Sequence, residues 1–162
     1  MNKNPEITDN IKTKNIPFYK NKYLLTVLLV VLVVCIFSIK FTFVMVAGNS
    51  MEPTYHNGNI LFAEKNTELS RFNTVIIYTK DNSFIIKRVI GLPGETVEYQ
   101  DNTLYINGKK IEDNYGNGTT NNFSVVLDKN SYFCLGDNRE NSKDSRYFGA
   151  FNKDEIFAKV IK

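Results

Sequence analysis

The sequence offers one short stretch in which a serine could act as a nucleophile. Ser50 lies within residues 48–54, between small and turn-forming neighbours, and Pro53 stiffens the chain just after it. Most serines in turns have no chemical role, and a serine hydroxyl is a poor nucleophile until a base accepts its proton. A catalytic interpretation of Ser50 therefore depends on a base elsewhere in the chain.

The single histidine is a weak candidate for that base. His56 lies six residues after Ser50 in a turn-rich segment, and the sequence offers it no apparent acidic partner. We therefore expect His56 to be a surface residue, which leaves little material for a Ser-His-Asp arrangement. The lysines are the remaining candidates.

Lys87 differs from the other lysines in its apolar neighbours. Residues 84–90 read Phe-Ile-Ile-Lys-Arg-Val-Ile, a pattern typical of a strand buried on both faces, because side chains alternate between the faces. Burial removes hydration from a charged amine and can lower its pKa from about 10.4 by roughly 3 to 5 units. A neutral Lys87 could then serve as a general base. The alternatives are that its amine reaches solvent from a strand edge or pairs with a carboxylate.

A polar segment near the C-terminal end could complete such a site. Residues 136–146 follow an apolar run and are rich in hydrogen-bonding side chains, and Asp144 and Arg146 are placed to pair with each other. The segment could be an ordinary polar surface loop. It could equally provide a hydroxyl that aims Lys87 at Ser50, together with a carboxylate and a guanidinium that fix the loop.

An apolar run ahead of the serine predicts a membrane anchor. Residues 23–39 are seventeen residues without a charge, which reaches the lower end of the length that a helix needs to cross a bilayer. A cleaved secretory signal is the alternative, but its apolar core is normally about 7 to 15 residues long, and residues 45–47 form a poor cleavage site. A buried core helix is disfavoured because the run is apolar on every face. We expect one transmembrane helix over residues 23–40.

The charge distribution predicts the orientation of this helix. Residues 1–40 carry six Lys/Arg and two Asp/Glu, a balance of +4, whereas residues 41–162 carry fourteen and fifteen, a balance of −1. Residues 1–22 should therefore form a flexible cytoplasmic tail, and residues 41–162 should lie outside the membrane. Because the basic excess belongs to the membrane flank, membrane lipid is an expected partner and nucleic acid is not.

The chain after residue 47 predicts a mainly β domain. Strand-like runs alternate with turn residues, and Asn107-Gly108 is a strong hairpin signal because both residues tolerate a positive φ. The expected strands are residues 60–63, 74–79, 84–90, 96–99, 103–106, 109–111, 123–127, 131–135 and 155–161. They favour a partly closed barrel or a sandwich, with residues 113–122 as a mobile loop. Cys35 and Cys134 should not form a disulfide, and no ligand spacing indicates a metal or another cofactor.

Taken together, three of these stretches resemble the bacterial type I signal peptidases, membrane-anchored Ser/Lys endopeptidases that remove signal peptides from exported proteins. Residues 50–54 fit S-M-x-P-T, residues 87–95 fit K-R-V-x-G-x-P-G-[DE], and residues 136–146 fit G-D-N-x-x-x-S-x-D-S-R. The motifs occur in the family's order, and the resemblance covers the chain from the apolar run to its end. It implies the family's β-rich catalytic fold. Only about forty residues separate the last two motifs, so the large second domain that some members insert there is not expected.

The resemblance also implies a role for each matching residue. Ser50 would be the nucleophile and Lys87 the general base, and Ser142 would be the hydroxyl that orients the lysine. The expected structural supports of the site are Arg88, Asp137, Asp144 and Arg146. Gly48 stands where several members carry a hydroxyl that helps to bind the oxyanion, so backbone N–H groups, that of Ser50 first, are expected to take over this role.

The expected substrates are preproteins with N-terminal signal peptides, cut after small residues at the outer face of a bacterial cytoplasmic membrane. The ten residues from Lys40 to Ser50 agree with this site of action, since they span at most about 36 Å. Asn59, Phe151 and Ala158 depart from residues usual in the family, which affects the expected substrate preference more than the chemistry.

Two other functions remain open. One is a catalytically silent, membrane-anchored β-domain that binds an envelope or pilus partner. The other is a self-cleaving Ser/Lys regulator, a class that normally carries a DNA-binding part, for which residues 1–22 leave no space. A silent domain would tolerate loss of the Ser50 hydroxyl and the Lys87 amine.

Overall fold

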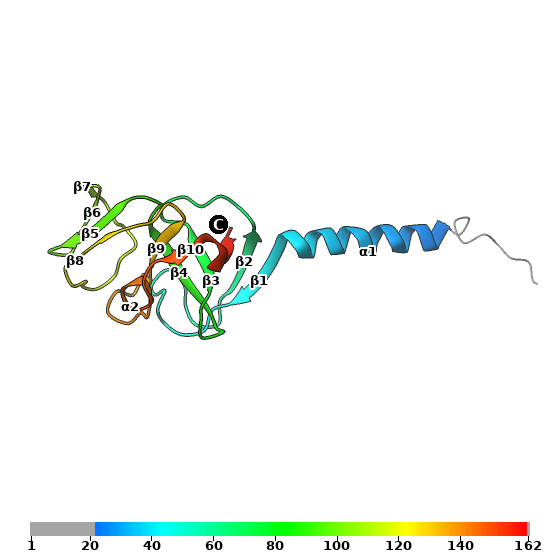
Figure 1. Ribbon diagram of the computed structural model, residues 1–162. Coiled ribbons are helices and arrows are strands. Elements are labelled where there is room, and N and C mark those ends of the chain that lie inside the picture. Colours follow the sequence, from blue (N-terminus) through cyan, green and yellow to red (C-terminus); the bar gives the residue numbers. More distant parts are fainter. Residues whose placement is uncertain (1–21, 162) are drawn as a thin grey trace, which may run out of the picture. The chain divides into compact units, whose positions relative to one another are not determined.

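The computed structural model describes residues 22–161, which form one long N-terminal helix and a mainly β domain (Figure 1). The chain divides between residues 37 and 38 into two compact units. Of the tail expected over residues 1–22, all but the last residue lies outside the described residues.

Helix α1 (Lys22–Lys40) corresponds to the apolar run. At about 1.5 Å per residue its 19 residues extend roughly 28 Å, close to the thickness of the hydrocarbon core of a bilayer. A helix satisfies its own backbone hydrogen bonds, which allows an apolar segment to exist in lipid. By length and composition, α1 is able to cross a membrane.

The β domain contains two antiparallel sheets. The larger sheet has the order β1-β2-β11-β3-β4-β9-β10, with β1 (Phe41–Met45), β2 (Ile60–Lys65), β11 (Ile156–Val160), β3 (Thr74–Tyr78), β4 (Phe84–Gly91), β9 (Ser131–Leu135) and β10 (Phe151–Asn152). The smaller sheet has the order β7-β6-β5-β8, with β7 (Lys109–Ile111), β6 (Thr103–Ile106), β5 (Thr96–Gln100) and β8 (Phe123–Val126). A short helix, α2 (Ser145–Phe148), and a 3-10 turn (Lys153–Glu155) complete the described elements.

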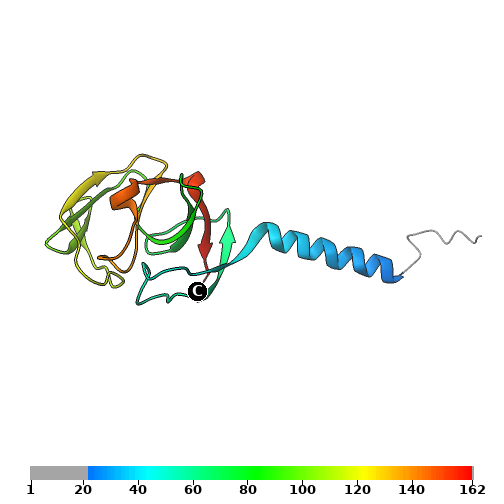
Figure 2. The same cartoon turned by 90° about the horizontal axis from the view of Figure 1, so that it is seen from below.

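The expected mainly β fold without a large inserted domain is confirmed, and each expected strand has an observed counterpart. Strand β1 was not expected, because its apolar residues follow the helix directly and look like a continuation of it. In the structure β1 pairs with β2, with Phe41 opposite Glu64 and Met45 opposite Ile60. Strand β11 pairs with the other edge of β2, so the last strand of the chain lies beside the first ones (Figure 2).

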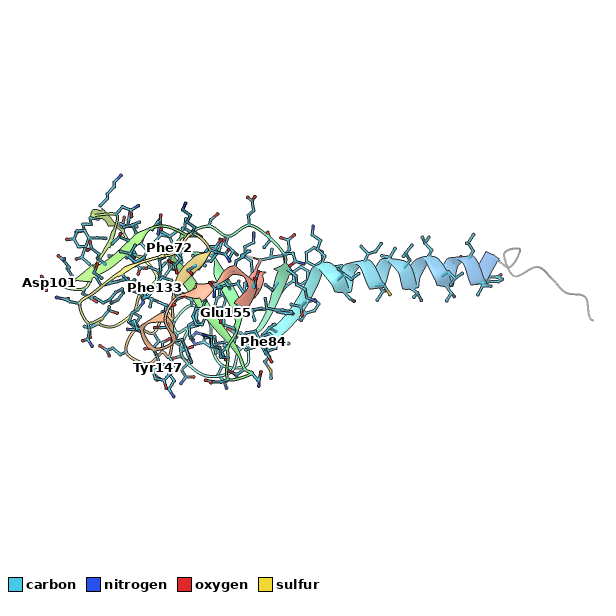
Figure 3. The ribbon with its side chains drawn as sticks, viewed as in Figure 1. Phe72, Phe84, Asp101, Phe133, Tyr147 and Glu155 are labelled. Carbon is cyan, nitrogen blue, oxygen red and sulfur yellow. The ribbon has the colours of Figure 1, made fainter. Side chains whose placement is uncertain are left out.

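Strand β4 runs through the best buried part of the larger sheet, paired with β3 on one side and β9 on the other. Val89 of β4 itself, Val75 of β3 and Cys134 of β9 have no exposed surface. Phe133 of β9 belongs to a second apolar cluster that the two sheets share, and it points into the domain (Figure 3). Each fully buried Val, Ile or Phe stabilises the fold by about 1.5 to 3 kcal/mol, and this burial sets the environment of β4.

The turn predictions can be examined directly in the backbone. Asn107 and Gly108 have φ values of 51° and 75°, as the predicted hairpin requires, and β6 and β7 are the strands that they join. Cys35 and Cys134 are both free.

Candidate active site

Strand β4 carries Lys87 into the apolar interior, where 3% of its surface remains exposed. Its Nζ lies 2.7 Å from the Ser50 Oγ and 2.9 Å from the carbonyl oxygen of Ile86. Burial lowers the pKa of Lys87 from 10.5 to about 8, although the carboxylates of Asp144 and Asp137 act in the opposite direction. Near pH 8 a large fraction of the amine is therefore neutral and able to accept the proton of Ser50.

Ser50 lies in a turn between β1 and β2 that has its own internal hydrogen bonds. The N–H of Tyr55 donates to the carbonyl of Met51 over 2.9 Å, and the N–H of Glu52 donates to that of Asn49 over 3.2 Å. The Met51 side chain is 1% exposed and anchors the turn in the core. These contacts hold the hydroxyl of Ser50 over β4.

A buried ion pair joins β4 to the polar segment of residues 136–146. Arg88 donates from Nε to Asp137 Oδ1 over 2.7 Å and from Nη2 to Asp137 Oδ2 over 2.5 Å, and neither side chain is exposed. Thr54 Oγ1 donates to the same carboxylate over 2.5 Å. The aromatic ring of Tyr115 covers the guanidinium at 3.7 Å. Three separate parts of the chain therefore meet at Asp137.

The expected pair between Asp144 and Arg146 is present. Arg146 donates from Nε and Nη2 to the Asp144 carboxylate over 2.9 and 2.8 Å, and the N–H of Gly136 donates to it over 3.0 Å. Burial by itself would raise the pKa of Asp144, but these hydrogen bonds hold it below its ordinary value. Because the Asp144 side chain also caps the N-terminus of α2, it ties both ends of the 136–146 segment together.

Ser142 lies beside the dyad with Gly136 between them. A Cβ atom added at Gly136 would lie 2.2 Å from Ser142 Oγ and 2.5 Å from the carbonyl oxygen of Ser50. The Ser142 Oγ is buried beside the Asp144 carboxylate, whose pKa it helps to lower. Among the described residues no hydrogen bond joins it to Lys87, whose amine bonds to Ser50 and Ile86. The orienting role of Ser142 stays a prediction.

The backbone around Gly48 determines which N–H groups could bind an oxyanion. Gly48 has a φ of +90°, a conformation that favours glycine, and its N–H donates to Asn57 Oδ1 over 3.0 Å. Within residues 22–161, the N–H of Ser50 makes no hydrogen bond. The N–H of Ser50, the first expected oxyanion donor, is therefore available, whereas that of Gly48 is engaged.

A pocket of about 130 Å³ adjoins the Ser50 hydroxyl. Its walls are formed by residues 44–47, 50–51 and 84–87, which are mostly aliphatic. Such a space suits an apolar side chain.

His56 is a surface residue, as expected, with 66% of its side chain exposed. The expectation that it has no acidic partner is wrong. Its Nδ1 lies 3.6 Å from a carboxylate oxygen of Glu52, which the sequence places four residues earlier on the same turn. A pair of this kind on the surface contributes little and does not involve Ser50.

Sequence reasoning missed two residues that contact the site from behind. Asn138 donates hydrogen bonds to the backbone at Asn49 and Ser50, and Arg139 forms an ion pair with Asp113. Asn138 occupies a fixed position of the third motif, which was a signal that could have been used. Arg139 occupies one of its variable positions, and nothing local connects it to Asp113. Among the described residues, no group of three or more His, Cys, Asp or Glu side chains could hold a metal ion.

The fold and the site define a class of protein: a β-rich domain in which a buried lysine amine lies within hydrogen-bonding distance of a serine hydroxyl, as in Ser/Lys hydrolases. The family model described as signal peptidase, peptidase S26, matches residues 20–161. This chain therefore belongs to the signal peptidase family, and its relatives place it with the bacterial type I enzymes.

Individual relatives cover most of the chain. Signal peptidase IB of Staphylococcus aureus (strain Mu50 / ATCC 700699) is 39% identical over 140 residues, with 71% of this chain and 73% of that protein covered. Signal peptidase I V of Bacillus subtilis (strain 168) is 36% identical over 154 residues, with 83% and 92% covered. The crystal structure of a signal peptidase I from Enterococcus faecalis V583 superposes with a TM-score of 0.54 at 35% identity, covering 59% of this chain and 98% of that one.

Proposed function

We propose that this protein is a membrane-anchored serine endopeptidase that removes N-terminal signal peptides from exported preproteins, with Ser50 as nucleophile and Lys87 as general base. Membership of the signal peptidase family supports the peptidase activity and the class of substrate. The observation that carries the assignment of the dyad is the 2.7 Å separation between the Lys87 amine and the Ser50 hydroxyl, with the lysine pKa lowered to about 8.

The first half of the reaction forms an acyl-enzyme. The neutral Lys87 amine accepts the Ser50 proton while Oγ attacks the scissile carbonyl carbon, and the resulting oxyanion receives a hydrogen bond from the N–H of Ser50. The lysine then returns its proton to the leaving nitrogen as the C–N bond breaks. The mature protein departs with a new N-terminus, and the signal peptide remains as an ester on Ser50.

The second half hydrolyses that ester. Lys87 is neutral again and accepts a proton from a water molecule as the water attacks the ester carbonyl. The proton passes from the amine to Ser50 Oγ when the C–O bond breaks, which regenerates the hydroxyl and releases the signal peptide as a carboxylate. In this scheme Arg88, Asp137, Asp144 and Arg146 support the site, and Ser142 orients the lysine.

The pocket beside Ser50 is where a residue before the cut would bind. Its aliphatic walls suit an apolar side chain such as that of Ala, in keeping with the small residues expected at the cut. The residues that precede the scissile bond would lie along this pocket, whose walls come from β1 and from the start of β4.

The location that fits this function is a bacterial cytoplasmic membrane. Residues 1–22 would form the cytoplasmic tail, residues 23–40 the anchor in contact with lipid, and residues 41–162 the extracytoplasmic catalytic domain. The apolar helix α1 and the family of the chain support a membrane-anchored enzyme, and the excess of lysines before the helix favours this orientation.

Cleavage of a purified preprotein by the full chain in detergent micelles tests the proposal. We expect the wild type to cut after a small residue and Ser50→Ala to lose at least about a thousandfold in rate, because the nucleophile is removed. The wild-type rate should rise about tenfold per pH unit up to pH 8 and then level off, as the Lys87 amine becomes neutral. Mass spectrometry of the products would locate the cut.

Ser70→Ala is the matched control, since Ser70 is exposed and its backbone alone participates in the fold. Cleavage retained by Ser50→Ala would eliminate the dyad mechanism. A wild-type protein that binds the preprotein without cutting it would favour the silent β-domain instead.

A further inference from the structure

The two peptide groups on either side of the Ser50 Cα are both held by one residue of the polar segment. Asn138 donates from its side-chain Nδ2 to the carbonyl oxygen of Asn49 over 3.2 Å. Its backbone N–H donates to the carbonyl oxygen of Ser50 over 3.1 Å. The side-chain contact crosses 89 residues of sequence, and both contacts join the turn that carries Ser50 to the 136–146 segment.

The hydrogen bond from the Asn138 side chain to the Asn49 carbonyl also constrains the orientation of the Ser50 N–H, because of the geometry of the peptide group. A trans peptide group is planar, and its C=O and N–H point in opposite directions. The carbonyl of Asn49 and the N–H of Ser50 belong to the same peptide group. A donor that fixes the direction of the carbonyl therefore fixes the direction of the N–H, which is the donor available for an oxyanion. The Asn49 carbonyl also accepts from the N–H of Glu52 within the turn, so Asn138 is the donor that ties this peptide group to the 136–146 segment.

We propose that Asn138 is the positioning residue of the oxyanion donor, orienting the Ser50 N–H through the carbonyl oxygen of Asn49. This inference rests on the proposed function. It explains how a site with Gly48 in place of a hydroxyl residue can still stabilise a developing negative charge, because a well-oriented N–H that points at that charge is an effective donor.

Asn138 is itself held from behind by residues 113–119, which we call the backing segment. Asn117 brackets it: the Asn117 N–H donates to the carbonyl of Asp137 over 2.7 Å, and the Asn117 carbonyl accepts from the N–H of Arg139 over 2.8 Å. The expected mobile loop at 113–122 is thus hydrogen-bonded to the site along its first half, and its short parallel bridge is opposite Asn138.

A buried polar cluster of Arg139, Asp113 and Tyr99 fixes the backing segment to the turn that carries Asn138. The Arg139 guanidinium lies 2.6 Å from the Asp113 carboxylate, donates to the hydroxyl of Tyr99, and donates from Nε to the carbonyl of Gly136 over 3.0 Å. Burial by itself would raise the pKa of Asp113, but the Arg139 charge holds it below its ordinary value, so this carboxylate stays ionised. Gly116 packs directly on the guanidinium, where any side chain would collide with it. Arg139 thus connects the smaller sheet, through Tyr99, to the turn that carries Asn138.

Two substitutions of Asn138 separate positioning from folding. Asn138→Ala removes the side-chain donor, and Asn138→Asp keeps the shape but replaces the Nδ2 donor with an oxygen that cannot donate. Both retain the backbone bond to Ser50. In the micelle assay we expect kcat to fall about 10- to 100-fold in both, with KM within about twofold of the wild type, because the lost interaction acts on the transition state. The pH midpoint should not move in Asn138→Ala, since Lys87 is untouched, whereas the new carboxylate of Asn138→Asp should shift it upward, in the direction in which Asp144 and Asp137 act on Lys87.

A peptide aldehyde with the sequence before the cut provides an independent readout. Ser50 adds to its carbonyl to give a tetrahedral hemiacetal whose oxygen occupies the oxyanion position, so its inhibition constant should rise by the same factor as kcat falls. A merely structural role of Asn138 would not produce this proportionality. The exposed Asn121 is the matched control, and Asn121→Ala should leave kcat and aldehyde inhibition unchanged.

The outcomes separate the inference from the proposed function. A wild-type rate in both Asn138 variants overturns the inference while leaving the peptidase intact, and so does a loss of kcat without weaker aldehyde inhibition. A shift of the pH midpoint in Asn138→Ala together with a raised KM and a lower melting temperature would mean that the substitution disturbs the structure of the whole site. This result would also overturn the inference. Failure of the wild-type protein to cleave any preprotein would instead refute the proposed function, and the inference with it.

Discussion

Strand β4, which carries Lys87, and the turn that carries Asn138 position their functional groups by different kinds of interaction. Lys87 sits on a central strand, where apolar packing on both faces fixes the amine and lowers its pKa to about 8. Asn138 sits on a turn, where directional hydrogen bonds and a buried ion pair behind it, between Arg139 and Asp113, fix a peptide plane. Packing is suited to excluding water, whereas hydrogen bonds are suited to setting a direction.

This difference indicates where stability and activity should oppose each other. On the strand side, the functional group is a buried amine whose charged form is disfavoured, so function costs stability. On the turn side, the polar groups are paired with one another, so the contacts that position the site also stabilise the fold. Substitutions should therefore separate activity from stability at Lys87 and affect both together around Asp137.

The largest expected effect follows from Lys87→Met, which keeps the length of the side chain and removes the amine. Cleavage should fall at least about a thousandfold, because no base remains for Ser50. At pH 7 the free energy of unfolding should rise by about 3 kcal/mol, since the lysine pKa falls from 10.5 unfolded to about 8 in the fold. Denaturant unfolding of the full chain in micelles measures the change.

The pH dependence of this gain has a definite sign. Below pH 8 the wild-type lysine is protonated in both states and the folded state bears the full penalty, whereas above pH 10.5 both states are neutral and the penalty vanishes. The advantage of Lys87→Met should therefore shrink between these values. Lys109→Met, at an exposed position, is the control and should show no such trend. A destabilised Lys87→Met at pH 7 would contradict the view that burial of the charge is costly.

Next in size is Asp137→Ala, which leaves the Arg88 guanidinium buried without its carboxylate. Both side chains are fully buried and share two hydrogen bonds, so the free energy of unfolding should fall by about 3 to 5 kcal/mol. Thermal unfolding followed by circular dichroism would detect this as a much lower melting temperature. Activity should fall with it, because Asp137 also receives the hydroxyl of Thr54 on the turn of the nucleophile.

An exposed ion pair offers the comparison for that experiment. Glu64 lies 3.2 Å from Lys40, whose side chain is 59% exposed, so Glu64→Ala should cost less than about 1 kcal/mol. Equal losses in Asp137→Ala and Glu64→Ala would mean that burial adds nothing to the Arg88 pair. The proposed difference between the apolar surroundings of Lys87 and the hydrogen-bonded turn would then be unsupported.

Features that a local sequence pattern determines could be predicted, whereas features that depend on contacts between distant segments could not. Lys87 was found because a strand has a period of two and apolar residues on both faces reveal burial locally. The hairpin at Asn107-Gly108 was found because positive φ restricts the residue types there. Strand β1 was missed, since its role depends on pairing with β2 across a turn, and an apolar segment after a helix carries no sign of that pairing.

The supports of the turn were harder to predict for the same physical reason. Tyr99, Asp113 and Arg139 meet in space from three separate segments, and a contact between distant polar residues leaves no periodic trace in any one of them. Residues 113–122 are polar and rich in Gly and Asn, a composition shared by mobile loops and by loops held through hydrogen bonds. Composition alone could not distinguish these two cases.

The smallest expected effect concerns Thr119, at the end of the backing segment. It tests whether contacts there also influence the position of Asn138. Glu140 is exposed and accepts hydrogen bonds from the N–H and the hydroxyl of Thr119 over 3.1 and 2.8 Å, and these bonds lower its pKa. Glu140→Ala should reduce kcat only about two- to threefold, since exposed hydrogen bonds contribute little against competition from water. Glu112→Ala, at another exposed glutamate, should have no effect. If Glu140→Ala reduced kcat as strongly as Asn138→Ala, the position of Asn138 would depend on the whole backing segment rather than on the contacts of Asn117 and Arg139.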